Sequence, residues 1–162
     1  MAVTSQESTE YTNAYSTTPP VMNDASEWAG RVRIMQFTTT QSGAGDATSS
    51  FAIGKLPPGK ITLIAYASSA YINWTTASAT MDLGWDAYTD LDGTSQAASV
   101  DGIDNGVSVD TAGFFSFGSA LTATGGLKSF ESREGVVIRL SSTDTAIVDA
   151  DTAVGYLLYV ND

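Results

Sequence analysis

The chain contains no cysteine and no histidine among its 162 residues. Without cysteine it has no disulfide and no thiolate metal site. Without histidine it lacks the commonest general base, the commonest transition-metal ligand and the usual partner of a catalytic serine. A hydrolytic triad cannot be built from these residues. We therefore predict a protein that is not an enzyme and that carries no cofactor and no transition-metal site.

Positive charge is also scarce. Seven basic residues stand against eighteen acidic ones, the net charge is −11, and no basic residue occurs between Lys60 and Lys128. Because phosphate groups are bound mainly through Lys and Arg, this composition argues against a nucleic-acid partner and against an anionic membrane. The excess acid either keeps the protein soluble or marks an acidic outer face opposite a sparsely basic one that meets a partner.

Long apolar runs, amphipathic helical patterns and internal repeats are missing as well. No apolar run approaches the ~20 residues that a membrane span requires. Charged residues make up 15% of the chain, below the roughly 25% of typical soluble domains, and Ser and Thr fill the difference. About eight to ten short segments with strand patterns are separated by turn residues, which predicts an all-β protein, an antiparallel β-sandwich or jelly roll.

Strands are predicted where apolar and polar residues alternate. Val32 and Ile34 alternate with Arg31 and Arg33, which predicts a strand that buries the two aliphatic residues. Two prolines and a glycine at residues 57–59 predict a turn. Further segments place these residues on shared faces: Ile61, Leu63 and Ala65; Met81, Leu83 and Trp85; Val136, Ile138 and Leu140; and Val154, Tyr156, Leu158 and Val160.

Residues 86–110 are rich in Asp, Gly and Ser and lack sustained periodicity. We interpret them as a long excursion from the sheet that faces solvent. Asp90, Asp92, Asp101 and Asp104 offer the oxygen ligands that Ca²⁺ prefers. The spacing lacks the full EF-hand pattern, and Asp-Gly pairs are ordinary turn formers, so the sequence leaves calcium binding open beside a purely structural role.

Two other groups of residues have alternative interpretations. Asp82 and Asp86, with Trp74 and Trp85 nearby, have the residue types of a glycosidase, although carboxylates on a strand are usually just solvated. Three phenylalanines lie close together at positions 114, 115 and 117. Adjacent residues of a strand point to opposite faces, so one of Phe114 and Phe115 must leave the main core. It packs either under a loop or in a subunit interface.

The first 29 residues have no core pattern. They are polar, carry Tyr11 and Tyr15, and contain Pro19 and Pro20, which disfavour a helix. We predict an extended N-terminal arm over residues 1–29, either a frayed tail or a strap ordered by a neighbouring subunit, and a single β-sandwich domain over residues 30–162. A strap can bury its tyrosines and prolines across a neighbour and complete an exposed sheet edge there.

Several stretches together resemble the head decoration, or cement, proteins of tailed bacteriophages. They are the Thr- and Ser-rich arm, KLPPGK followed by ITLIAYASS, MDLGWDAY, and KSFESREGVVIRLSS leading to VGYLLYVND. The resemblance implies a structural protein, made in the host cytoplasm and placed on the outer surface of the capsid. It also implies binding to the major capsid protein, association as a homotrimer, and stabilisation of the shell against internal DNA pressure. The candidate partner-binding residues are Tyr11, Tyr15, Pro19, Pro20, Trp28, Arg31, Arg33 and Lys60.

Two alternatives stay open at this point. A carbohydrate-binding or adhesin module is also an acidic β-sandwich, and it would use Trp74, Trp85 and Tyr88 to stack on sugars. A component of a phage tail or fibre is the other alternative, and it differs from a decoration protein in its location on the particle.

Overall fold

The computed structural model describes residues 17–21 and 31–161. The described residues form twelve strands: β1 Val32–Thr40, β2 Ser50–Leu56, β3 Gly59–Ile64, β4 Ser69–Asn73, β5 Thr80–Trp85, β6 Tyr88–Thr89, β7 Ser95–Gln96, β8 Ser99–Ser108, β9 Gly113–Ser116, β10 Leu127–Ser132, β11 Val136–Ser141 and β12 Thr152–Asn161. Two short 3₁₀ turns, η2 Ala65–Ala67 and η3 Thr122–Thr124, interrupt them. No helix in this part of the chain has the length and apolar character needed to cross a membrane.

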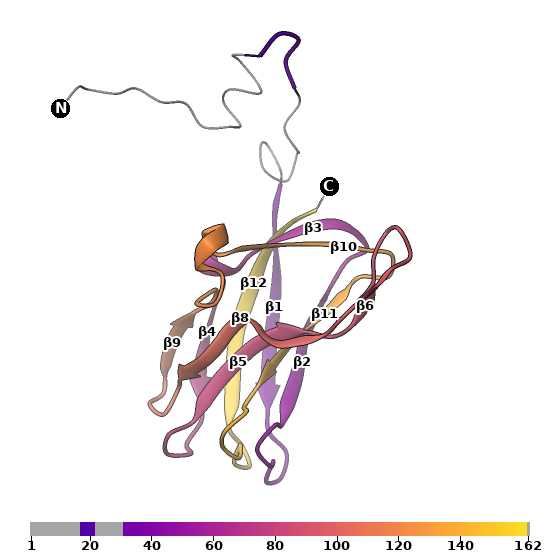
Figure 1. The fold of residues 1–162 in the computed structure, drawn as a ribbon. Coiled ribbons are helices and arrows are strands. Elements are labelled where there is room, and N and C mark those ends of the chain that lie inside the picture. The colour runs from indigo at the N-terminus through magenta and orange to yellow at the C-terminus, as the bar shows by residue number, and fades with distance from the viewer. Residues whose placement is uncertain (1–16, 22–30, 162) are drawn as a thin grey trace, which may run out of the picture.

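The strands form two antiparallel sheets that pack face to face (Figure 1). One sheet has six strands. In it β1 pairs with one side of β12, while β3 and β4 pair with successive halves of the other side. Strand β10 then pairs with β3, and β9 with β4. The second sheet has the order β2-β11-β5-β8, and β6 and β7 form a separate small hairpin. Two antiparallel sheets packed in this way form a β-sandwich of the jelly-roll kind, which confirms the predicted all-β fold class.

The core lies between the two sheets. Its largest fully buried side chains are Trp74, Phe130, Leu56, Ile61, Leu63, Ile72, Met81, Leu83, Ile103, Ile138, Leu140 and Ile147. The alternation predicted for β3, β5 and β11 is therefore confirmed, because their predicted apolar faces line this core. The turn between β2 and β3 is confirmed too, with Gly59 at a φ of 110°, a conformation that glycine adopts without strain.

The predicted buried face of β1 is wrong. Val32 and Ile34 are 53% and 56% exposed, whereas Phe37 on the opposite face is buried and Met35 packs against the core. The reason is that β1 is apolar on both faces, and its register with β12 aligns Met35 with the buried Leu157. In β12 the four residues predicted to share a face do so, but that face is the outer one, where Val154 is exposed and only Val160 is buried, and Ala153 and Leu157 point into the core.

The interpretation of residues 86–110 as an excursion from the sheet is wrong for its second half. Residues 99–108 form β8, the edge strand of the four-stranded sheet, and Ile103 and Asp104 are buried there. The sequence does not predict this strand, because its pairing with β5 shifts register twice and its side chains therefore do not alternate regularly.

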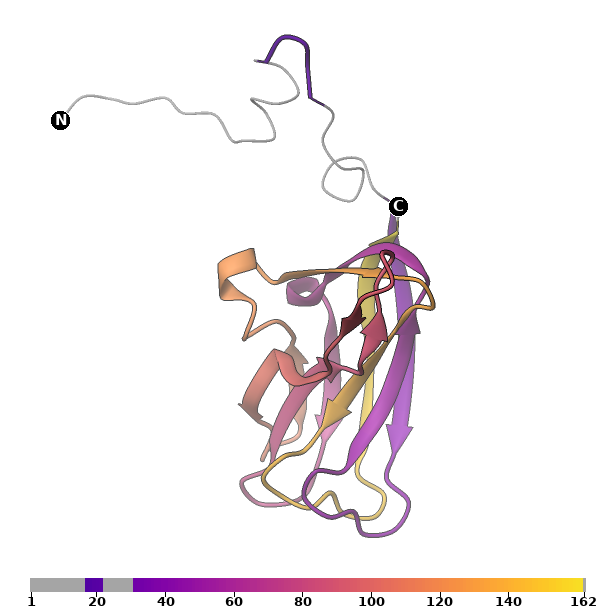
Figure 2. The same cartoon turned by 45° about the vertical axis from the view of Figure 1, so that its right-hand side comes forward.

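Four loops meet at one end of the sandwich, the lower end in Figures 1 and 2. They cover residues 41–49, 74–79, 109–112 and 142–151, and together they hold five aspartates and no lysine or arginine. Buried Asp151 ties two of them together by accepting hydrogen bonds from the Thr75 N–H and hydroxyl and from the Val148 N–H. We call this the acidic end. The starts of β1 and β3 lie at the other end of the six-stranded sheet, beside the last residues of β12.

Candidate functional site

The outer face of the six-stranded sheet carries several exposed apolar side chains, although its outward residues Thr62 and Val160 are buried. Register pairs place Val154 beside Thr38 and Tyr71, and Tyr71 beside Phe114. Phe114 is 82% exposed, and Tyr71, Val154 and Ile34 are exposed as well. We call this surface the six-stranded face; its exposed apolar residues are Val32, Ile34, Tyr71, Phe114, Leu127 and Val154. Phe114, Tyr71 and Val154 adjoin one another in the sheet, and an exposed apolar patch of this kind is typical of interaction sites.

The six-stranded face is almost free of charge. Among the outward positions of its strands the charged residues are Lys60 and Glu131, which lie directly opposite each other in the β3–β10 pair. The remaining outward positions hold Thr, Ser, Asn, Gln and apolar residues. The other acidic residues in the described part of the chain therefore lie elsewhere than on this face.

A shallow groove of about 330 Å³ crosses this face. Gln36, Thr38, Val154 and Tyr156 line it together with an aromatic pair, Tyr71 and Phe114. The two rings meet edge to face, with centroids 5.2 Å apart, which is a favourable aromatic geometry. The groove thus lies directly beside the most exposed aromatic side chain of the described residues.

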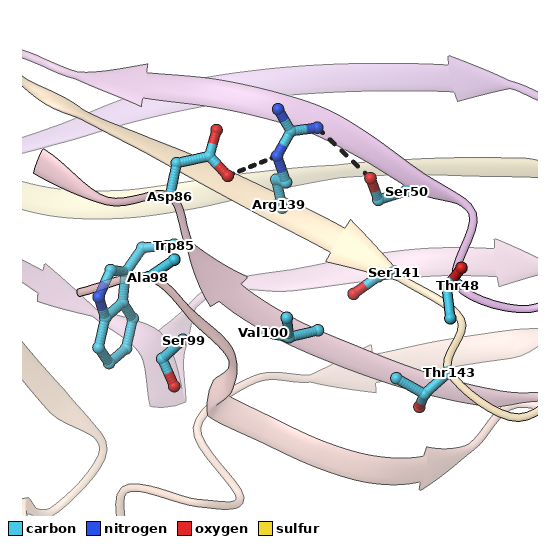
Figure 3. Close-up of a pocket in the computed structure, with 10 residues that line it drawn as sticks. All are labelled: Thr48, Ser50, Trp85, Asp86, Ala98, Ser99, Val100, Arg139, Ser141 and Thr143. Atoms are coloured by element: carbon cyan, nitrogen blue, oxygen red, sulfur yellow. Dashed lines mark hydrogen bonds and ion pairs between the residues drawn. The ribbon is translucent and has the colours of Figure 1, made fainter.

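The outer face of the four-stranded sheet is different, because the chain covers part of it. The backbone of Ser99 and Val100 crosses over Gly84 so closely that a Cβ built there would lie 1.9 Å from the Ser99 carbonyl oxygen. Beside this crossing is a cleft of about 180 Å³ between residues 98–100 and the outward side chains of β11 (Figure 3). Only glycine at position 84 permits the crossing.

An ion pair closes one end of the cleft (Figure 3). Arg139 Nε lies 2.5 Å from Asp86 Oδ1, and Arg139 Nη1 donates to Ser50 Oγ at 3.4 Å. The hydrogen bond to Asp86 raises the pKa of Arg139 above its usual value. Ser141 also lines the cleft; its Oγ is buried and has no hydrogen-bond partner among the described residues.

The predicted sugar-stacking surface does not form. Trp74 is 2% exposed and belongs to the core. Trp85 and Tyr88 both meet Phe130 edge to face, and Lys128 Nζ lies 4.4 Å from the centre of the Trp85 ring. These rings pack within the chain, although Trp85 also lines the cleft in Figure 3.

The two candidate catalytic carboxylates are also engaged. Asp82 is buried rather than solvated, since it accepts hydrogen bonds from the Gly106 N–H and from the Thr143 hydroxyl. Asp86 is paired with Arg139. Each carboxylate therefore has a structural partner within the chain.

Three of the four candidate calcium ligands accept hydrogen bonds within the chain, and Asp101 accepts them from the Ser99 hydroxyl and the Asn105 amide. Asp90 accepts hydrogen bonds from the Thr94 N–H and the Gln96 amide, and the bond from Thr94 is the main cause that lowers the pKa of Asp90. Asp104 is buried, which raises its pKa, although the Gly118 and Ser119 N–H groups donate to it. No three His, Cys, Asp or Glu residues in the described ranges gather into a group that could hold a metal ion.

The predicted partner-binding residues fall into two groups. Tyr11, Tyr15 and Trp28 lie outside the described residues, as does most of the predicted arm. The rest are described: Pro19 and Pro20, Arg31 and Arg33 are exposed, and Lys60 is half-buried.

Among these basic residues, Arg33 of β1 and Lys60 of β3 lie at the same end of the six-stranded sheet, on opposite sides of β12. That end is opposite the acidic end. Of the six-stranded face, the sequence indicated only Phe114 or its neighbour, through the rule that adjacent strand residues point apart.

The chain is similar in fold to viral capsid proteins. No protein-family model matches it, and no curated protein matches its sequence. A chain of the cyanophage Pam1 capsid asymmetric unit matches with a TM-score of 0.50 at 14% identity, over 82% of this chain and 86% of that one. The infectious bursal disease virus VP2 subviral particle and the same virus's Gx strain match with TM-scores of 0.47 and 0.40, at 10% and 13% identity. Each match covers 81% of this chain but only 33% and 32% of those longer viral chains.

Proposed function

We propose that this chain is a structural protein of a phage particle, a capsid decoration protein that binds the outer surface of the head and stabilises it, rather than an enzyme. The observation that carries the proposal is the match to a chain of the Pam1 capsid, which spans most of both chains. At 14% identity this match is a fold-level analogy. The surface of the molecule supplies the physical support.

The charge distribution suits a protein that stands on a shell. Arg31, Arg33 and Lys60 lie at one end of the sandwich, and the five aspartates of the acidic end lie at the other. In the proposed arrangement the basic end faces the major capsid protein and the acidic end faces solvent. Residues 1–29, which precede β1 at the basic end, then act as a strap on the shell or on a neighbouring copy, and three copies associate as a homotrimer.

Binding to empty heads of the phage that carries the gene tests this proposal. We expect the full chain to co-sediment with the heads and to raise the temperature at which they break. Removal of residues 1–22 should weaken binding by about tenfold or more, because each strap adds a tethered contact to an assembly that already holds the protein. Heads that never bind the full chain would contradict the decoration role, and undiminished binding of the truncated chain would contradict the strap alone.

A location in the phage tail or fibre is the neighbouring alternative. A reconstruction of the particle distinguishes the two, since density for this chain on the tail would replace the head assignment.

Carbohydrate binding is a second candidate because of the cleft in Figure 3. Its specific support is the buried, unpartnered Ser141 Oγ beside Arg139 and Asp86. Binding on a glycan array that is lost in Arg139→Ala and kept after removal of residues 1–22 would favour this function.

A further inference from the structure

We infer that copies of this chain associate through the six-stranded face, with Phe114 of one copy entering the groove beside Tyr71 and Val154 of the next. The inference deepens the self-association in the proposed function and names its surface. It can fail while binding to phage heads holds.

The first argument is charge. Two copies of a chain with net charge −11 repel each other, most strongly where their aspartates approach. On the six-stranded face the two charged outward residues, Lys60 and Glu131, are opposite in sign and lie side by side. This face therefore brings no net charge into contact when two copies meet.

The second argument is symmetry. Most homo-oligomers are closed by rotation axes, and close to such an axis each residue meets its own copies. A charged residue there would meet the same charge, whereas Phe, Tyr and Val meet favourably. Interface centres are enriched in aromatic residues and depleted in Lys and Glu, as the surface around Phe114 is. A partner of opposite charge would instead be drawn to the acidic end.

The third argument is shape. Phe114 is 82% exposed, and the groove that it borders has a volume of about 330 Å³. An exposed ring and a groove on one surface complement each other between identical copies. Each Phe114 gains a lining of Val154 and Tyr156, and each groove loses its water.

A matched pair of valines tests the surface. Val154 on the six-stranded face is 48% exposed, and Val100 on the opposite side of the sandwich is 53% exposed. We expect sedimentation of the full-length chain to show an oligomer that Val154→Lys and Phe114→Lys dissociate, with association at least about tenfold weaker, while Val100→Lys leaves it intact. Both valines are exposed, so circular dichroism and thermal unfolding should show that all three variants fold.

Thiol labelling supplies an independent readout, because the chain has no cysteine of its own. In Val154→Cys the single thiol should react slowly with a maleimide at concentrations where the oligomer forms and quickly after dilution. In Val100→Cys the thiol should react quickly at both concentrations.

Four results would overturn the inference. They are a wild-type chain that stays monomeric, an equal loss of association in Val100→Lys and Val154→Lys, an oligomer that Phe114→Lys and Val154→Lys leave intact, and slow labelling at position 154 that persists on dilution. The last result would mean that the chain's own residues 1–22 cover the face, and their deletion would then restore fast labelling. Binding to phage heads, measured separately, decides the decoration role.

Discussion

The two outer faces of the sandwich differ in how far the chain itself covers them. On the four-stranded sheet the chain covers itself, since residues 99–100 cross over Gly84 and the Asp86–Arg139 pair lies beside them. On the six-stranded sheet the outward side chains are mostly uncharged, and six apolar ones are exposed. A lone protein gains nothing from exposing Phe114, so the difference supports the proposal that the six-stranded face contacts another copy of the chain.

Strand β1 gives the sharpest test of this comparison, because it carries both a buried core residue and an exposed residue of the six-stranded face. Phe37→Ala should lower the free energy of unfolding by about 3–5 kcal/mol, since it leaves a cavity in the core. Ile34→Ala should change it by no more than about 0.5 kcal/mol, because Ile34 is exposed. Denaturant unfolding at concentrations where the chain is monomeric measures both changes. A larger loss in Ile34→Ala than in Phe37→Ala would reverse the assignment of the faces.

Sequence patterns predicted the strands whose two faces differ. Ile61, Leu63 and Ala65 in one segment, and Val136, Ile138 and Leu140 in another, recur at every second position, and all six are buried. Their identity as core residues follows from local period alone.

The same patterns could not choose between two apolar faces. In β1 both Val32 with Ile34 and Met35 with Phe37 form an apolar set, and the pairing with β12 decides which set is inside. That pairing joins residues more than a hundred positions apart, so the local alternation of residues cannot predict it. In β8 the buried Asp104 interrupts the apolar positions, so alternation of apolar and polar residues does not predict this strand.

The candidate interaction surface was hidden for the same reason. In the sequence, Tyr71 and Val154 have the residue types of a core, and only the sheet pairing shows that they lie on the outer face. Phe114 was the exception, because its neighbour Phe115 takes the inward position and packs against the core.

The covered face can be tested at its crossing point. Gly84→Ala should cost about 1–3 kcal/mol of unfolding free energy, because a methyl group there meets the backbone of Ser99 and Val100, which must move. Gly113→Ala in β9 is the matched control. Its methyl group meets nothing closer than 3.7 Å, and the substitution should be neutral or slightly stabilising. Thermal unfolding of both variants measures the difference, and equal stability would show that β8 does not need the crossing.

The smallest expected effect is a difference in salt dependence between the Asp86–Arg139 ion pair and association through the six-stranded face. Asp86 and Arg139 are more than a third exposed, so a double-mutant cycle with Asp86→Ala and Arg139→Ala should give a coupling of at most about 1 kcal/mol. Added salt should shrink this coupling, because it screens exposed pairs. Association through the six-stranded face should respond in the opposite direction, since salt screens the repulsion between two acidic copies while the face itself holds no net charge. Sedimentation and the cycle, run over the same range of ionic strength, should therefore show one contact weakening as the other strengthens. An oligomer that salt dissociates would mean that ion pairs, not the apolar face, hold the copies together.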